Sequence, residues 1–379
     1  MTDPAPDLPV FDSSAVCSAH VVISVRDVPA NLAFFHDRLG FRVDAVYPAD
    51  HPRHVHLSGH GLALALHEAD HDVSPTLRLT FHGATTPPVH EPLRAPNGSL
   101  IEFAAEDATL ILPPNVPEFF VSRLDEKSNW GEGRAGMRYR DLIPNRQGGR
   151  FIASHIRITE DGVVPDYVHF HRVRFQLIYC VRGWARLVYE GQGEPFVMQA
   201  GDCVLQPPEI RHRVLESGGG LEVVEVTCPA DHETLADHSL LLPTPTLEPN
   251  RRFAGQRFAF HQAGKARWEP WRMDGFESRN VGIDEATGGL AGAHVVRPRR
   301  QLKPEAQAHQ GEFLFLFLLD GHMRLETAHY GIHYLRRDDA VVIPAGECHR
   351  LCESDTSLEF LEIRVGALPT TVCELDARA

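Results

Sequence analysis

Short apolar runs alternate with turn residues through most of the chain. From about residue 128 onward, segments such as 176–183 and 203–207 are enriched in β-branched and aromatic residues, and Gly, Pro and Asp separate them. This spacing is typical of short antiparallel strands. The pattern predicts a mainly β protein built from small antiparallel barrels.

The strand pattern occurs twice. The segment from Gln176 to Gly183 is echoed by 314–321, the segment 201–207 by 338–344, and His212 is matched by His349. The offset stays between 137 and 140 residues throughout. A constant offset indicates duplication of one folding unit. We therefore predict two tandem barrels, covering residues 128–235 and 250–368.

The first hundred residues follow a different pattern of strand, helix and strands. The predicted helix, 29–39, places Leu32, Phe35 and Leu39 on one stripe and ends at Gly40. Strands are expected at 20–27, 43–47 and 62–66, and a reduced second half at 76–82 and 99–104 lacks a helix. We predict an α+β module of βαβββ type over residues 17–108.

The remaining segments have no strong pattern. Residues 1–16 are interpreted as a flexible tail, 109–127 as a linker, 236–249 as a Pro-rich connector and 369–379 as a C-terminal tail. At 379 residues the chain is long enough for two or three domains.

Composition excludes several classes of protein. A net charge of −14 argues against a nucleic-acid partner, since phosphate binding requires clustered Lys and Arg. No run of eighteen apolar residues exists, and residues 1–14 do not have the pattern of a signal peptide. The seven cysteines are scattered without CxxC spacing, which predicts reduced thiols in a cytoplasmic protein. We also expect a homodimer.

Candidate metal chemistry begins at His169 and His171. Residues i and i+2 of a strand point to one face, so both imidazoles are expected to meet, and Gln176 and His212 can converge on them. Three nitrogens and one oxygen predict a divalent-metal site. The alternative is a pair of core histidines that are satisfied by hydrogen bonds.

These residues resemble the paired metal-binding motifs of the cupin superfamily, H-x-H-x4-E-x6-G and G-x5-P-x-G-x2-H. Gln176 replaces the usual Glu, and Glu209 replaces the usual Gly. The resemblance implies a bicupin, two barrels of the double-stranded β-helix (jelly-roll) type. It also implies metal ligation by His169, His171, His212 and Gln176.

The N-terminal module resembles the vicinal-oxygen-chelate superfamily of glyoxalases and extradiol dioxygenases. The resemblance places ligand-like residues at His20 and Glu102, but it lacks a complete second module. We expect this module to serve dimerisation or to wall the first barrel. We interpret His51, His54, His56 and His60 as solvated residues in a loop-rich stretch.

The second barrel is chemically weakened. Gln307, His309 and His349 are its remaining candidate ligands, but Leu314 takes the position of Gln176. Phe313, Phe315 and Phe317 crowd the neighbourhood. We expect this barrel to be structural or to bind an apolar group.

A neutral Gln in the ligand set leaves the full charge on the metal, which favours anionic chelating ligands. The leading hypothesis is an Fe(II) dioxygenase that binds O2 and a small oxygenated organic acid or phenol. Redox-neutral chemistry at Ni, Mn or Zn, and a non-catalytic binding role, stay open. Residues interpreted as substrate contacts are Arg157, His155, Ile178 and Cys180.

Overall fold

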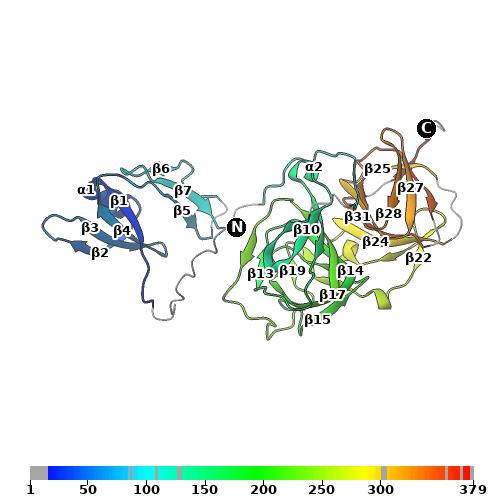
Figure 1. Ribbon diagram of the computed structural model, residues 1–379, viewed down its shortest axis with the longest axis horizontal. Helices are drawn as coiled ribbons and strands as arrows, with labels where there is room; N and C mark the ends of the chain where they lie inside the picture. Colours follow the sequence, from blue (N-terminus) through cyan, green and yellow to red (C-terminus); the bar gives the residue numbers. More distant parts are fainter. Residues whose placement is uncertain are drawn as a thin grey trace, which may run out of the picture. The chain divides into compact units, whose positions relative to one another are not determined.

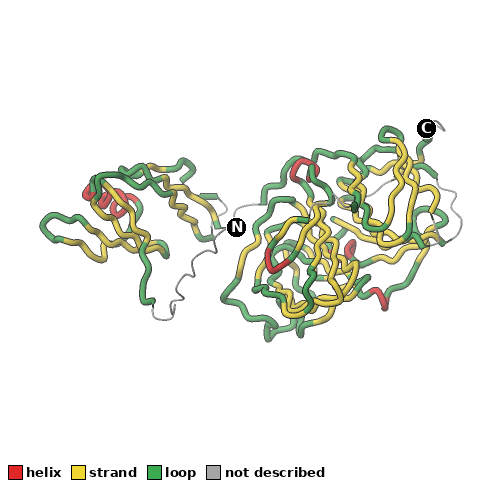
Figure 2. Tube along the Cα trace, viewed as in Figure 1, coloured by secondary structure: helices red, strands yellow, loops and turns green. Residues whose placement is uncertain are grey.

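The computed structural model describes residues 16–83, 86–87, 89–106, 110–125, 130–299, 305–354, 357–367 and 370–375. The chain divides into two compact units, residues 1–109 and 110–379. Strands dominate both units (Figures 1 and 2), which confirms the mainly β fold class. In the described part of the chain, every helix is too short to cross a membrane.

The N-terminal unit begins with the predicted βαβββ module. Its sheet has the order β1-β4-β3-β2, and its helix is followed directly by a π-helical turn at Phe34–Arg38. Asp27 caps the helix by accepting from the Ala30 backbone N–H, and Phe35 and Leu39 are buried against the sheet. The elements are β1 (Val21–Val25), α1 (Val28–Ala33), β2 (Arg42–Tyr47), β3 (His54–Gly59) and β4 (Leu62–Glu68).

In the N-terminal unit, the structure contradicts one expectation and confirms another. His54 and His56 lie on the regular strand β3, so their assignment to a loop-rich stretch is wrong. The reduced second half forms a three-stranded sheet of order β5-β7-β6, with no helix among its described residues. These strands are β5 (Thr76–Phe81), β6 (Leu93–Arg94) and β7 (Leu100–Ala105).

The first barrel is built around two long antiparallel strands, β14 and β17. Their register shifts near Gly183, where φ is +69° and an added Cβ would lie 2.5 Å from the Gly218 carbonyl oxygen, so only glycine fits there. The elements are β9 (Gly131–Glu132), η3 (Arg134–Gly136), β10 (Arg138–Asp141), α2 (Arg146–Gly149), β11 (Ile152–Arg157), β12 (Gly162–Val163), β13 (His169–His171), β14 (Phe175–Tyr189), β15 (Phe196–Gln199), β16 (Cys203–Leu205), β17 (His212–Cys228) and β18 (Thr234–Ala236).

The second barrel repeats this arrangement. Gln307 pairs with His349 across β25 and β30, as His169 pairs with His212 across β13 and β17. Its elements are β22 (Glu269–Pro270), β23 (Phe276–Asn280), α3 (Ile283–Ala286), β24 (Ala291–Pro298), β25 (Gln307–His309), β26 (Phe313–Asp320), β27 (His322–Thr327), β28 (Gly331–Arg336), β29 (Ala340–Val342), β30 (His349–Ser354), β31 (Glu359–Val365) and β32 (Thr370–Val372). The predicted duplication is therefore present in the fold.

Two segments interpreted as irregular carry strands. β8 (Phe120–Ser122), in the expected linker 109–127, pairs with β29 of the second barrel. β32, in the expected tail 369–379, pairs with β25. The expected tail 1–16 lies outside the described residues except for Val16. Between the barrels come β19 (Arg252–Phe253), β20 (Gln256–Arg257), β21 (Ala259–His261) and η4 (Ala263–Lys265), and β21 pairs with β16 of the first barrel.

The barrels share one core and each has an interior of its own. Phe151 of the first barrel stacks on Phe313 of the second, with ring centroids 4.3 Å apart. A pair of related arginines also crosses between the barrels. Arg140 donates to the Asp338 carbonyl, and Arg279 donates to the Gly201 carbonyl. These contacts hold the two halves of residues 110–379 together.

The prediction that all seven cysteines are reduced is wrong for one pair. Cys348, just before β30, forms a disulfide with Cys373, just after β32. The bond joins the last strand to the second barrel. Among the described residues, the cysteines without a disulfide are Cys17, Cys180, Cys203, Cys228 and Cys352.

Candidate metal centre

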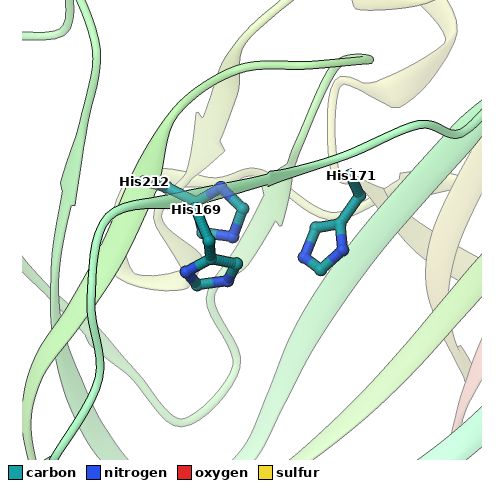
Figure 3. Close-up of side chains that lie close together, drawn as sticks. All are labelled: His169, His171 and His212. Carbon is teal, nitrogen blue, oxygen red and sulfur yellow. The ribbon is translucent and has the colours of Figure 1, made fainter. Parts of the chain in front are cut away.

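Three histidines meet inside the first barrel. His169 and His171 lie on β13 and His212 begins β17, and one ring nitrogen from each lies within 4.8 Å of the other two. The ring centroids of His169 and His212 are 4.2 Å apart, and the ring of His171 lies 5.2 and 5.3 Å from them. Figure 3 shows the rings of His169 and His212 close together and the ring of His171 to one side of them. All three side chains are buried.

Hydrogen bonds fix the orientation of each ring. Nδ1 of His169 lies 2.8 Å from the Tyr167 carbonyl, and Nδ1 of His212 lies 3.0 Å from the Ile210 carbonyl. A carbonyl only accepts, so each Nδ1 carries the proton and Nε2 is the basic nitrogen. Nδ1 of His171 lies 3.0 Å from the Thr234 hydroxyl. Such outer partners are typical of metal-ligating histidines, and the donor set fits a divalent transition metal.

Gln176 lies next to the histidines in a chain of buried polar groups. The hydroxyl of Tyr189 donates to Oε1 of Gln206 at 2.6 Å, and Nε2 of Gln206 donates to Oε1 of Gln176 at 3.1 Å. The same Gln206 nitrogen lies 3.2 Å from Nε2 of His212. Burial raises the pKa of the Tyr189 hydroxyl well above its ordinary value of 10. Ligation by Gln176 stays a prediction, and Gln206 is a residue that the motif did not reveal.

A cavity of about 350 Å³ opens beside the centre. Its polar lining residues include His171, His212, Gln206 and Glu225. None of the lining residues that the structure describes is Lys or Arg. Most of the wall is apolar, and comprises Met137, Ile152, Ile156, Ile158, Ile178, Ala185, Leu187, Met198, Val214, Leu221 and Val223. The cavity is therefore suited to an apolar molecule with a polar end.

Only one of the four expected substrate contacts lines this cavity. Ile178 does, whereas Cys180 is buried in the barrel interior, where burial raises its pKa to about 12. Neither His155 nor Arg157 is among the residues that line it. Ser154 and Ile156 face it instead, since neighbouring residues of a strand point to opposite sides.

His155 and Arg157 belong to a charged network on the other face of β11. Nε2 of His155 lies 2.9 Å from Glu222, and the Arg157 guanidinium packs 4.2 Å from the centre of the Trp130 ring. His155, Glu222 and Asp338 also form a group with metal-ligand spacing. Arg140 contacts this group, and burial lowers the pKa of that guanidinium to about 10. The positive charge of Arg140 beside His155 and Asp338 opposes metal binding by this group.

Glu225 is the carboxylate that sequence reasoning missed. It lies on β17 and lines the cavity, with Ser154 and Ile178 as its cross-strand neighbours. The mainly apolar run 221–228 contains two charged residues, Glu222 and Glu225, and they were the available signal.

The positions in the second barrel that correspond to the metal centre make different contacts. Nε2 of His309 lies 2.8 Å from the Ile343 carbonyl, and its Nδ1 accepts from the Gly311 N–H at 3.1 Å. Both nitrogens of this ring are therefore engaged by the backbone. Gln307 donates to the Met273 sulfur, and burial lowers the pKa of His349 to about 4. Leu314 is buried where Gln176 lies in the first barrel. This arrangement favours a structural second barrel.

The ligand-like residues of the N-terminal unit have other partners. The ring of His20 lies 4.9 Å from that of His56, and Glu102 forms an ion pair with Arg78 at 2.9 Å. His20 precedes β1 and Glu102 lies on β7, in different sheets. A ligand role for either residue stays a prediction.

Comparisons with known proteins agree with this architecture. Residues 18–103 match the Glyoxalase/Bleomycin resistance protein/Dioxygenase superfamily. Among solved structures, two mutants of Bacillus subtilis oxalate decarboxylase, one substituted at four neighbouring positions and one with two residues deleted, are similar at TM-scores of 0.50 and 13% identity. Each match covers 70% of this chain and 80% of that one. A comparison with curated proteins found no match.

These neighbours are bicupins, so the two tandem barrels have the bicupin fold. At this level of identity the likeness concerns the fold alone. The segment matched to the glyoxalase superfamily is the N-terminal module, as predicted from residues 18–68 and 97–103.

Proposed function

We propose that this protein is a metal-dependent dioxygenase that acts on a small aromatic or enolic compound carrying chelating oxygens. The observation that carries the proposal is the three-histidine centre, of which His171 and His212 line a largely apolar cavity. His169, His171 and His212 would hold the metal, with Fe(II) as the proposed ion. Bound Fe(II) supplies a redox partner for O2 and a Lewis acid for substrate oxygens.

The cavity wall supports an apolar substrate over a small polyanion. A dicarboxylate such as oxalate would need cationic partners, and the described lining includes no Lys or Arg. A phenol or enol presents one apolar body to Ile156, Ile178 and Leu187 and its oxygens to the histidines. Burial of the apolar body in the cavity would exclude water from the histidines.

A second candidate is redox-neutral acid–base chemistry at Mn, Ni or Zn, because Glu225 lines the same cavity. A carboxylate beside a Lewis acid is the group that an isomerase, cyclase or decarboxylase requires. The similar solved structures are named decarboxylases. We place this candidate second because the apolar wall, as far as the structure describes it, offers no partner for a highly charged substrate.

Oxygen consumption tests the proposal. Protein purified without oxygen and loaded with Fe(II) is mixed with a panel of catechols, hydroquinones and 1,3-diketones in an oxygen-electrode cell. The proposal requires O2 uptake that matches substrate loss and that disappears in His212→Ala protein. Turnover of the same compounds under anaerobic conditions, with Mn, Ni or Zn, would overturn it and favour the second candidate.

A further inference from the structure

We propose that Gln206 is a hydrogen-bond donor to the anionic substrate oxygen at the metal centre, held in place by Tyr189. This inference rests on the proposed function, because it assumes a chelating oxygen beside the three histidines. It assigns a substrate-positioning role to a residue at a variable position of the second metal-binding motif, directly before Pro207.

The hydrogen-bonded chain has a defined direction. Tyr189 donates to Oε1 of Gln206, which turns the NH2 group of Gln206 toward Gln176 and the histidines. One N–H of that group serves Gln176. Its nitrogen also lies 3.2 Å from Nε2 of His212, the atom that would bind metal. In this orientation Gln206 donates toward the centre and does not ligate.

Gln206 and Tyr189 are both buried. Gln206 is 3% exposed and Tyr189 is 2% exposed, yet Gln206 still lines the cavity. A buried amide keeps its orientation when its oxygen is already engaged, because reversal would leave polar atoms without partners. The ring of Tyr189 also lies near-parallel to that of His212, with centroids 5.4 Å apart. The donor is therefore pre-positioned before any ligand enters.

The second barrel lacks this polar chain. At the repeat offset of 137 to 138 residues, Gln176, Gln206 and Tyr189 correspond to Leu314, Ile343 and Thr327. The residues Leu314 and Ile343 are buried and apolar. The polar chain is thus replaced in the same barrel in which Gln307 replaces His169. This co-occurrence links the chain to the metal centre and not to barrel folding.

The chemistry of the ligand follows from the donor. A phenolate or enolate oxygen bound beside His212 would accept the Gln206 N–H in a charge-assisted hydrogen bond. A neutral ligand would gain less from the same contact. We therefore infer that Gln206 selects substrates that bind as oxyanions.

Two probes test this role, both on the full chain. Co(II) binding to metal-free protein is followed by visible absorption, and 4-nitrocatechol binding to the Co(II)-loaded protein is followed by the absorption of the catecholate. The variants are Gln206→Leu and Tyr189→Phe, and Gln199→Leu on the exposed end of β15 is the matched control. Thermal unfolding of each variant reports whether the barrel stays folded.

We expect Gln206→Leu to bind Co(II) within about threefold of wild type but 4-nitrocatechol about ten- to a hundredfold more weakly. Tyr189→Phe should weaken 4-nitrocatechol less, and both should shift the bound catecholate spectrum. Unchanged 4-nitrocatechol binding in folded Gln206→Leu would overturn the inference. Loss of Co(II) binding there would also overturn it and make Gln206 a ligand. Wild-type protein that binds neither probe would instead overturn the proposed function.

Discussion

His169 and His212 are direct cross-strand partners, and their rings lie 4.2 Å apart between β13 and β17. The same pair of positions in the second barrel holds Gln307 and His349. One chain therefore contains the same scaffold with and without a complete set of three histidines.

Loss of the hydroxyl at Thr234 should weaken metal binding. This hydroxyl lies 3.0 Å from Nδ1 of His171 and orients that ring. Outer partners of this kind typically change metal affinity by about 10- to 100-fold, so Thr234→Val should lower Co(II) affinity at least about tenfold. Titration of metal-free protein with Co(II) measures this affinity. Thr327→Val, at a buried threonine of the second barrel, should leave the affinity unchanged.

Replacement of Glu225 by Gln separates the two candidate functions. A dioxygenase whose substrate binds already ionised does not need this carboxylate, so we expect kcat within about threefold of wild type. General acid–base catalysis would typically lose 10²- to 10⁴-fold in the same variant. Steady-state kinetics, with a substrate found in the oxygen-consumption test, gives kcat for the wild type and for Glu225→Gln. A loss of that size with normal substrate binding would favour redox-neutral chemistry.

We expect Arg157 to stabilise the fold and not to contact the substrate. Its guanidinium packs on Trp130 and pairs with Glu222, and the related Arg297 packs on Trp268 in the second barrel. We expect Arg157→Met to lower the free energy of unfolding by about 1 kcal/mol, with 4-nitrocatechol binding unchanged. Arg297→Met should lower the free energy of unfolding, measured by urea denaturation, by a similar amount. Weaker 4-nitrocatechol binding in Arg157→Met alone would restore the substrate role inferred from sequence.

Stability should fall on mild acidification, partly through His261. Burial lowers the pKa of this histidine to about 4, against about 6.5 in an unfolded chain, with Arg279 adding to the shift. Between these values the unfolded state binds the proton and the folded state does not. The contribution of neutral, buried His261 to the free energy of unfolding is therefore complete above pH 6.5 and is lost as the pH falls toward 4.

Urea midpoints at pH 7.5, 6 and 5 measure this effect. The decline in His261→Gln protein should be shallower than in wild type, since the substituted residue does not titrate. Parallel declines in the two proteins would show that His261 does not contribute. His294 and His309, whose pKa values burial also lowers, act in the same direction in both proteins.

The elements with a strict period were predictable from sequence. The repeat offset and the pair His169 and His171 follow from local spacing, and the structure brings these two residues together with His212. The helix stripe Leu32, Phe35 and Leu39 also faces the core or packs against it, because amphipathic periodicity defines one buried face.

The face of β11 that meets the cavity was not predictable. Most residues from Ile152 to Arg157 are buried on both faces of the strand, since one face meets the cavity and the other meets the second barrel and Trp130. Alternation gives two sets of residues but does not say which set lines the cavity. Gln206 was missed for a related reason, because its partners Gln176 and Tyr189 lie 30 and 17 residues away on β14, and local spacing does not show that they meet.

The most direct test of the central claim is metal content per chain, measured by mass spectrometry on protein purified without oxygen. Three proteins are compared: wild type, His169→Gln, which copies the second barrel, and His309→Gln, the matched control in that barrel. We predict about one divalent ion per chain in wild type and His309→Gln and none in His169→Gln. An empty wild type, or a metal lost with His309 and kept without His169, would contradict the account.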